Sequence, residues 1–304
     1  MSWGRRRVFA LPLVLLAILV GPAAVSGDML GRIGLHVTAT TDTLLDLALE
    51  HDLGFVEIVA ANPGLDPWLP GAGRPVLLPT AHLLPASPRR GIVINLADQR
   101  LYYFPPRGSV QTYPIGVSSE GVAIRLGTAR VVGKRVNPVW FPPPSVRAEA
   151  PDLPESVPPG PDNPLGAFAL DLSWPATAIH GTNNPYGIGR RVSHGCFRLY
   201  PEGIEKLFRQ VTIGTEVTVV NQPIKLGWSA GMLFLEVHPT LEQADELELH
   251  GTASPAALPD LRMLVMEMAG AAADEIDWAA VDRIARQHKG VPFQILRSKS
   301  LLPP

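Results

Sequence analysis

A single cysteine stands close to two histidines in the second half of the chain. Cys196 is the only cysteine among 304 residues; His194 lies two positions before it and His180 sixteen. A thiol becomes a good nucleophile when a base takes its proton, and imidazole does this near neutral pH. Gly181 and Gly195 follow the two histidines directly, and glycine lets backbone approach a reacting group closely. The pattern predicts cysteine nucleophile chemistry with backbone N–H groups facing a developing oxyanion.

Of the two histidines, His180 is the expected general base. It ends a predicted strand, and the glycine-rich segment 181–189 gives the chain room to fold back toward Cys196. The second ring nitrogen of a catalytic histidine needs an acceptor that fixes its tautomer. No Asp or Glu lies in residues 173–201, so we expect a main-chain carbonyl in this role. The backbone N–H groups of Gly195 and Cys196 are the expected oxyanion donors.

Two other interpretations use the same residues. His180, His194 and Cys196 could be three ligands of a catalytic zinc ion, although the His-x-Cys spacing is short and there is no second cysteine. Cys196 could instead be packed as a small hydrophobic side chain, which would leave the gathered histidines and glycines unexplained. We expect neither a metal nor another cofactor.

Residues 1–27 have the pattern of a secretory signal peptide. Three arginines at positions 5–7 precede an apolar run of 13 residues, Val8 to Val20, which leads into small residues. Such a run is short for a membrane span; an uncleaved N-terminal anchor is the alternative. The rest of the chain is then exported, and no later stretch approaches a membrane span. A lone cysteine there cannot form an intramolecular disulfide.

Composition excludes some classes of partner. The formal net charge is −2 and 46% of residues are hydrophobic, which is enough for a packed core and does not suggest nucleic-acid binding. The chain length after the signal suggests one main domain with smaller parts.

Residues 33–80 predict a small strand–helix–helix–strand unit. Asp42-Thr43 signals a helix start, Asn62-Pro63-Gly64 ends a second amphipathic run, and residues 75–79 form a closing strand. The unit resembles the LysM carbohydrate-binding fold, although Thr41 stands where a glycine is usual. The resemblance implies a glycan-binding module that acts independently of the catalytic domain; a helical cap without a ligand is the alternative.

Residues 90–222 predict a mainly β domain of short strands with one or two helices. We expect a hairpin turning at 96–99, strands at 110–117, 129–136, 167–172, 177–179 and 216–220, and a helix at 201–210. Residues 142–164 contain nine prolines, too many for the interior of a helix or sheet. We expect this segment to be a long ordered loop that walls a substrate groove.

Residues 223–304 form a mixed C-terminal extension whose role the sequence does not indicate. A strand pair is expected within 228–237 and helices at 258–269 and 277–288. Glu246 and Glu248 alternate with leucines before His250, and a solvated edge explains them better than a metal site does.

The motifs around the cysteine resemble the signature of YkuD-type L,D-transpeptidases, over about residues 90–222. The matching residues are His180-Gly181-Thr182-Asn183 and Ser193-His194-Gly195-Cys196-Phe197-Arg198-Leu199. The resemblance implies a YkuD-like β-sandwich or barrel. It also implies site roles: Cys196 as nucleophile, His180 as base oriented by the Gly181 carbonyl, Ser193, His194 and Gly195 around the oxyanion hole, and Arg198 and Asn183 as substrate-binding residues.

The resemblance further implies a reaction on peptidoglycan. Cysteine attacks the L-centre carbonyl of diaminopimelate in a tetrapeptide stem, releases D-alanine and passes the acyl group to an amine. The acceptor would be another diaminopimelate in a 3→3 cross-link, a lysine of an outer-membrane lipoprotein, or water in a hydrolase. The layout is similar to the periplasmic branch of the family, and carbapenems are expected to acylate the cysteine. A non-catalytic peptidoglycan-binding scaffold is the alternative of another class.

Overall fold

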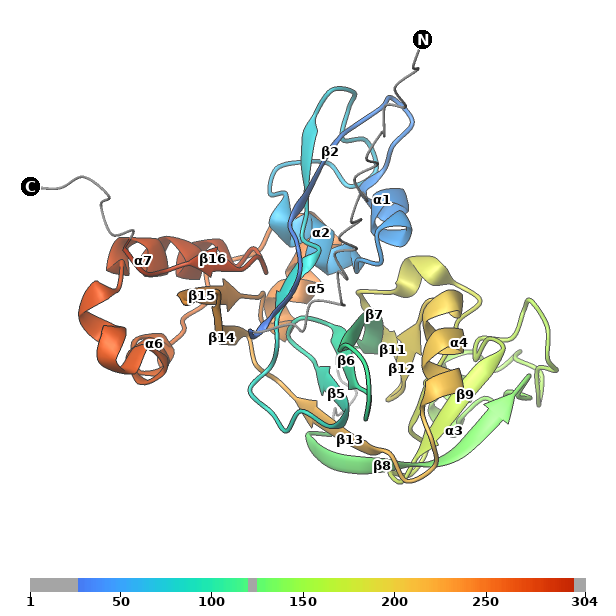
Figure 1. The fold of residues 1–304 in the computed structure, drawn as a ribbon. Coiled ribbons are helices and arrows are strands. Elements are labelled where there is room, and N and C mark those ends of the chain that lie inside the picture. Colours follow the sequence, from blue (N-terminus) through green and yellow to red (C-terminus); the bar gives the residue numbers. More distant parts are fainter. Residues whose placement is uncertain (1–26, 120–124, 298–304) are drawn as a thin grey trace, which may run out of the picture.

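The computed structural model describes residues 27–119 and 125–297, so the predicted signal peptide lies outside the described residues except for Gly27. The central feature is a nine-stranded sheet in the order β11-β7-β12-β10-β9-β8-β13-β5-β6. Because β6 also pairs with β7, the sheet curls and closes on itself (Figure 1). The mainly β catalytic domain is confirmed. Its strands are β5 (Gly91–Asn95), β6 (Arg100–Phe104), β7 (Gln111–Ser118), β8 (Gly127–Val136), β9 (Phe168–Leu172), β10 (Ala178–His180), β11 (Arg191–Ser193), β12 (Phe197–Leu199) and β13 (Glu216–Val220).

Branched apolar side chains fill the interior of the curled sheet. Ile92, Leu170 and Val217 are fully buried there. The helix after the cysteine motif, α4 (Pro201–Gln210), packs Leu207 into the same core. Burying one such side chain contributes about 1.5–3 kcal/mol, so this core fixes the strands whose ends carry the candidate site.

The proline-rich segment contains a short helix, so the prediction of a loop throughout residues 142–164 is wrong. α3 (Pro144–Glu149) begins with Pro144, a position where the missing N–H of proline costs no hydrogen bond. The next proline is Pro151, which leaves the helix interior unbroken. Proline density therefore limited the length of this helix and did not prevent it.

The N-terminal part has the predicted strand–helix–helix–strand order, with β2 and β3 paired antiparallel. A second pair, β1 with β4, was not predicted. Thr43 starts the first helix by accepting a hydrogen bond of 3.0 Å from the N–H of Asp46. Asn62 ends the second helix and binds the backbone of Leu77 on β3. The elements are β1 (Met29–Gly31), β2 (Gly34–Val37), α1 (Leu44–Glu50), α2 (Phe55–Ala61), β3 (Pro75–Leu78) and β4 (Ala81–Leu83).

Backbone contacts attach this N-terminal part to the catalytic domain. The N–H groups of Phe55 and Val56, at the start of α2, donate to the carbonyls of Ile188 (3.1 Å) and Gly189 (3.0 Å). A Cβ added to Gly189 would overlap the Cα of Gly54. Residues 33–80 therefore fold against the glycine-rich loop that follows His180, and not apart from it.

The C-terminal extension forms a three-stranded sheet, β14-β15-β16, beside α6 and α7 (Figure 1). Apolar side chains of the sheet and of the two helices form one buried cluster. Helix α5 packs Ala244 and Leu247 against the core of the N-terminal part. The predicted strand pair and two helices are present, and Glu246 and Glu248 lie on α5. The elements are β14 (Ile224–Ser229), β15 (Met232–Val237), α5 (Leu241–His250), α6 (Leu261–Ala269), α7 (Trp278–Gln287) and β16 (Phe293–Gln294).

A cluster of buried charges joins the extension to the catalytic domain. The Nζ of Lys225 lies 2.8 Å from Asp98 and 2.8 Å from Glu236, and all three side chains are fully buried. Tyr102 donates its hydroxyl to Asp98 at 2.7 Å. Although burial lowers the pKa of Lys225, its two carboxylate neighbours outweigh this effect and raise that pKa well above its ordinary value.

The same buried region reaches the N-terminal part. Arg100 of the catalytic domain contacts Glu57 of α2 at 2.7 Å, and His82 lies 3.4 Å from the same carboxylate. Removing one member of such a cluster leaves an uncompensated buried charge, which is strongly destabilising. Buried charged contacts thus join the three parts of the chain, whose hydrophobic side chains form separate clusters.

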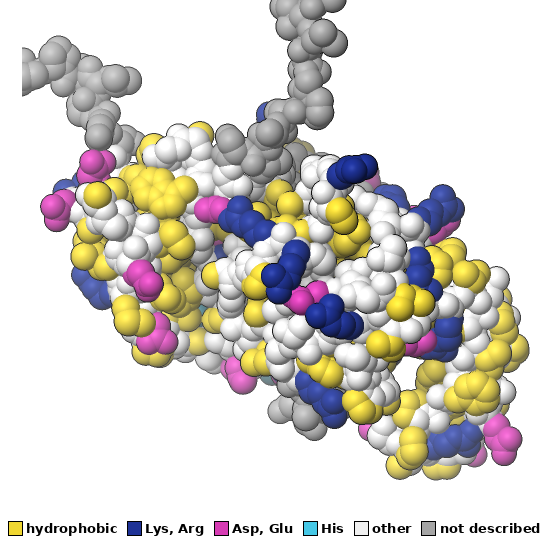
Figure 2. All heavy atoms as spheres, turned by 60° about the horizontal axis from the view of Figure 1, so that its bottom comes forward, with side chains coloured by type: hydrophobic (Ala, Val, Ile, Leu, Met, Phe, Trp, Pro, Cys, Tyr) yellow, Lys and Arg dark blue, Asp and Glu magenta, His cyan; other side chains and the backbone are white. Residues whose placement is uncertain are grey.

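The surface carries charges of both signs. Figure 2 shows the molecule turned so that the lower side of Figure 1 comes forward. On this face, Lys and Arg side chains lie among acidic and apolar ones. An exposed ion pair on such a surface contributes about 0–1 kcal/mol to stability. In the part of the chain that the structure describes, no helix has the length and apolarity that crossing a membrane requires.

Candidate active site

Cys196 lies in the turn between β11 and β12. Gly195 has a φ of +103°, a conformation that favours glycine over other residues. The buried hydroxyl of Ser193 donates to the carbonyl of Cys196 at 2.6 Å and so closes the turn. The serine and glycine of the motif therefore shape the backbone that presents the thiol.

His180 is the last residue of β10, which pairs in parallel with β12. Since Cys196 directly precedes β12, this pairing brings His180 and Cys196 to the same edge of the sheet. The Nδ1 of His180 lies 2.7 Å from the carbonyl of Gly181, and the ring is buried. With Nδ1–H donating to that carbonyl, the lone pair is on Nε2, the nitrogen available to act as a base.

Burial keeps both groups uncharged near neutral pH. It lowers the pKa of His180 to about 4, with backbone hydrogen bonds to Gly181 and Leu165 opposing it in part. It also raises the pKa of the Cys196 thiol, against a backbone hydrogen bond from Ala178 and the positive charge of Arg198. The site therefore holds a neutral thiol and a neutral imidazole, an arrangement that suits proton transfer during attack.

The thiol opens onto two cavities. The first, here the His180 cavity, has a volume of about 70 Å³ and is lined by His180, Ser193, His194 and Arg198. The second, here the Trp174 cavity, has a volume of about 440 Å³ and is lined by Trp174, Arg135 and Asp171. Cys196 and the segment 140–165 border both cavities. The proline-rich segment thus walls a groove, as the sequence predicts.

Arg198 lines the His180 cavity from β12. Its Nε is buried and has no hydrogen-bond partner among the described residues. Burial lowers the pKa of Arg198, yet an arginine remains charged in proteins. A buried guanidinium nitrogen without an acceptor is suited to an anionic ligand.

The side chain of His194 points to the proline-rich segment and not to His180. Its Nε2 lies 3.1 Å from the Oε2 of Glu149, at the end of α3. The imidazole therefore links the cysteine turn to that segment. Only the backbone of His194 remains available for the oxyanion-hole region that the motif implies.

Asn183 lies away from the thiol. It is exposed, lines neither cavity at Cys196, and donates its Nδ2 to the carbonyl of Asp162 at 3.1 Å. This bond ties the glycine-rich loop to the proline-rich segment. Substrate binding by Asn183 stays a prediction, and the geometry shows a bracing contact.

Sequence reasoning missed Arg135 and Asp171. Arg135 belongs to a strand that mixes branched and basic residues, and Asp171 stands just outside the span searched for an acid near His180. Only the pairing of β8 with β9 brings them together, because it sets Gly133 opposite Asp171 and Arg135 opposite Ala169. No sequence signal for this pair exists without that register.

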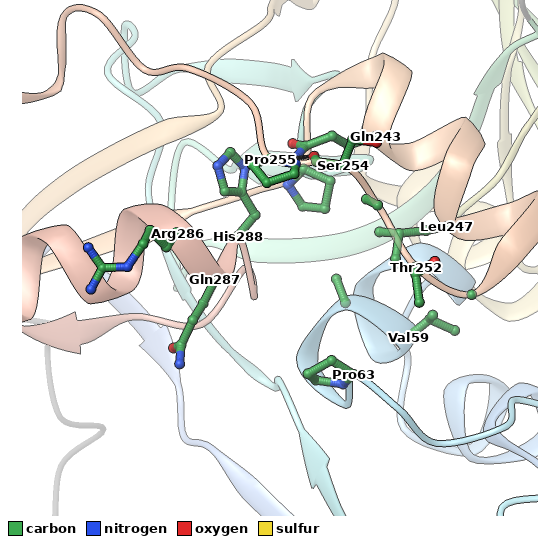
Figure 3. Close-up of a pocket in the computed structure, with 14 residues that line it drawn as sticks. Val59, Pro63, Gln243, Leu247, Thr252, Ser254, Pro255, Arg286, Gln287 and His288 are labelled. Carbon is green, nitrogen blue, oxygen red and sulfur yellow. Dashed lines mark hydrogen bonds between the residues drawn. The ribbon is translucent and has the colours of Figure 1, made fainter.

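A separate cavity of about 240 Å³ lies between α2, α5 and the end of α7, with Val59, Leu247 and Pro255 on its walls (Figure 3). One of its two amide side chains, Gln243, donates to the carbonyl of Ser254 at 2.6 Å. The one cysteine of the chain is elsewhere. Across residues 27–119 and 125–297, no group of three or more His, Cys, Asp or Glu side chains is placed to hold a metal ion.

Comparison with known proteins shows which family the chain belongs to. Residues 89–219 match the YkuD family, described as an L,D-transpeptidase catalytic domain. Over 281 residues the chain is 38% identical to "Probable L,D-transpeptidase YcfS" of Escherichia coli (strain K12), covering 88% of this chain and 85% of that one. It is 36% identical to "Probable L,D-transpeptidase ErfK/SrfK" of the same organism, covering 84% and 83%.

Among solved structures, the chain is similar to the NMR structure of the catalytic domain from E. faecium L,D-transpeptidase. The match covers 44% of this chain and 99% of that one, with 21% sequence identity and a TM-score of 0.35.

Proposed function

This chain belongs to the YkuD family of L,D-transpeptidases, and we propose that it is a cysteine-dependent enzyme acting on the tetrapeptide stems of peptidoglycan. The observation that supports this best is the His180 cavity, which Cys196 and His180 both line. The Nδ1 of His180 is held by the Gly181 carbonyl at 2.7 Å, which leaves Nε2 free for a proton. The substrate and the acceptor in this proposal come from the family to which the chain belongs.

In the first half-reaction, the Sγ of Cys196 attacks the carbonyl carbon of the third stem residue, at the L-centre of diaminopimelate. His180 takes the thiol proton at Nε2 as the C–S bond forms. The backbone N–H groups of Gly195 and Cys196 hold the oxyanion. The C–N bond to the terminal residue then breaks, His180 returns the proton to the departing nitrogen, and D-alanine leaves a thioester on Cys196.

Arg198 is the proposed partner for the carboxylate of that terminal D-alanine. It borders the same cavity as His180, and its Nε has no partner among the described residues. A charge-assisted hydrogen bond there would place the scissile nitrogen beside the base.

In the second half-reaction, an amine takes the place of the departed D-alanine. His180 accepts its proton, the new C–N bond forms and the thiol of Cys196 is released. A second diaminopimelate gives a 3→3 cross-link, and the lysine of an outer-membrane lipoprotein gives an anchored protein. Both acceptors require an exported enzyme, and we place the mature chain in the periplasm, with residues 33–80 as a LysM-like glycan-binding part.

Incubating the purified mature chain with disaccharide-tetrapeptide tests this function. We expect stoichiometric D-alanine release, a thioester on Cys196 by intact-protein mass spectrometry, and a product heavier than the donor. Cys196→Ala is the control and should release none. A product lighter than the donor by the terminal residue, with no cross-link, would show a hydrolase; absence of D-alanine would favour the non-catalytic scaffold.

A further inference from the structure

A charged pair lines the larger cavity at the thiol. The guanidinium of Arg135 contacts the carboxylate of Asp171 through two nitrogens: Nη2 lies 2.7 Å from Oδ1, and Nε lies 3.0 Å from Oδ2. Both side chains are partly open to solvent, at 41% and 34% exposure. Each therefore keeps surface that a ligand in the Trp174 cavity can reach.

We infer that Arg135 and Asp171 are the specificity determinants for the third residue of the donor stem, and that they bind a side chain ending in an ammonium and a carboxylate on one carbon. The inference rests on the proposed function and identifies which donor this chain selects. It assigns the Trp174 cavity to the donor side chain.

The direction of the reaction supports this assignment. The departing nitrogen must lie close to His180, which lines the His180 cavity and not the other one. In the tetrahedral intermediate the nitrogen and the α-carbon of the attacked residue are different substituents of one carbon. With the nitrogen on the His180 side, that α-carbon and its side chain extend away from His180, and the Trp174 cavity is the other space that Cys196 borders.

The chemistry of the pair selects a zwitterion. A lone cation or anion would compete with one member for the other, because the two are already bonded. A group with both charges can lie antiparallel to the pair, its ammonium on Asp171 and its carboxylate on Arg135, without separating them. Diaminopimelate ends in such a group at its D-centre, whereas lysine has the same chain and ammonium but no carboxylate.

Two neighbours show that the strands are shaped around the pair. Gly133 faces Asp171 across β8 and β9, and a Cβ there would lie 2.9 Å from the Oδ2 of Asp171. A side chain at Gly133 would therefore displace the carboxylate. Trp174 supplies an apolar wall to the same cavity, against which the methylene chain of the donor residue can pack.

The test uses three synthetic donors, L-Ala-γ-D-Glu-X-D-Ala, on the full mature chain. X is meso-diaminopimelate, the same residue amidated at its D-centre carboxylate, or L-lysine. The measurement is the rate of first-turnover D-alanine release at subsaturating donor, which excludes acceptor effects. We expect the diaminopimelate donor to react at least about 10-fold faster than the other two, the usual scale for a charge-assisted hydrogen bond.

Substitutions separate recognition from folding. Arg135→Gln should slow the diaminopimelate donor about 10–100-fold and leave the amidated and lysine donors nearly unchanged. Asp171→Asn should slow all three. Arg130→Gln is the matched control, since Arg130 lies on the same strand, pairs with Glu216 and lines neither cavity. The alkylation rate of Cys196 by iodoacetamide reports an intact site in every variant.

Equal rates with all three donors in the unmodified chain would overturn the inference, as would an Arg135→Gln loss of the same size for every donor at an unchanged alkylation rate. If Asp171→Asn changes the alkylation rate of Cys196, the result with Arg135→Gln alone decides whether the inference holds. Absence of D-alanine release from every donor would instead refute the proposed function, so the two failures are distinct.

Discussion

At the scale of single residues, the site holds Cys196, the proposed nucleophile, and His180, the proposed base, as neutral groups. Burial favours the uncharged form of both side chains, because it lowers the pKa of His180 and raises the pKa of Cys196. A preformed thiolate–imidazolium pair would need the opposite shifts. In the proposed mechanism the thiol therefore stays protonated until a substrate carbonyl is in place and the proton moves to His180.

The two histidines should differ sharply in their effect on activity. His180→Ala should lower the first-turnover rate of D-alanine release by about 10²–10⁴-fold, the usual contribution of a positioned general base. His194→Ala should cost less, because its imidazole contacts Glu149 and not His180. The measurement is kcat/KM for tetrapeptide with both variants; the reverse order of losses would exchange the two roles.

The pH dependence of alkylation tests the neutral pair. Because burial raises the pKa of Cys196, its thiolate fraction at neutral pH is smaller than that of a free thiol. The rate of iodoacetamide modification should therefore rise with pH to a midpoint above about 8.5. Mass spectrometry of samples quenched between pH 5 and about 10 gives the profile. A midpoint near 6 would mean a thiolate–imidazolium pair.

Carbapenems should form a one-to-one covalent adduct on Cys196, and ampicillin a slow adduct or none. The expectation comes from the family resemblance: the strained lactam carbonyl reaches the oxyanion hole, whereas the enzyme cleaves after an L-centre and has no use for D-alanyl-D-alanine mimicry. Intact-protein mass spectrometry gives the adduct mass. Persistence of the adduct in Cys196→Ala would place the nucleophile elsewhere.

Several site features were predictable because they are local in the sequence. The unique cysteine and the absence of acids in 173–201 led to His180 and a main-chain orienting carbonyl, and the contact with Gly181 has that form. Arg135 and Asp171 were not predictable, since they are 36 positions apart and only a strand register brings them together. The contact of His194 with Glu149 likewise depends on a helix that the sequence did not predict.

At the scale of elements, one close backbone approach holds α2 against the loop after His180. Gly189 has a φ of +73°, and a Cβ there would overlap the backbone of Gly54. Gly231 has nearly the same φ, +75°, and no atom lies within 4 Å of the position that a Cβ would take there. The two glycines therefore separate the cost of backbone conformation from the cost of the contact.

Gly189→Ala should destabilise the chain by about 2–4 kcal/mol, and Gly231→Ala by about 1 kcal/mol. The smaller value is the conformational cost of a left-handed residue, and the excess is the cost of overpacking. Urea unfolding of both variants at neutral pH measures the difference. Equal losses would mean that α2 is not held by this contact.

Helices and strands were predictable where the sequence pattern was strong. The prediction failed where tertiary packing determines the secondary structure. The hairpin of β5 and β6 and helix α4 lie at the predicted residues, because alternation and capping are local signals. β1 and β4 were missed, since three-residue strands carry no period. α3 was missed because proline was counted over the segment and not position by position.

At the scale of the whole molecule, the parts predicted as separate share a buried charged cluster. Lys225 and Glu236 come from the extension, Asp98 from the catalytic domain and Glu57 from the N-terminal part. Composition could not reveal this, because charged residues are ordinarily exposed. The extension, which the sequence left without a role, supplies the cation that keeps two buried carboxylates ionised.

Burial of His82 and His180 should make the stability of the folded chain acid-sensitive. Burial lowers the pKa of His82 well below its ordinary value and that of His180 to about 4. The unfolded chain therefore binds protons below about pH 6.5 that the folded chain does not, and stability falls as the pH falls. Each histidine contributes a slope of up to about 1.4 kcal/mol per pH unit. Glu57, whose pKa burial raises, opposes this in part.

Urea unfolding at pH 7, 6 and 5 should accordingly show a steep loss of stability in the unmodified chain. His180→Gln and His82→Gln should each reduce the slope of the unfolding free energy against pH by the amount that uptake of about one proton causes, even if they lower stability at pH 7. His250→Gln, at an exposed position on α5, is the control and should leave the slope unchanged. A slope that none of these substitutions alters would place the acid sensitivity in His288, whose pKa burial also lowers.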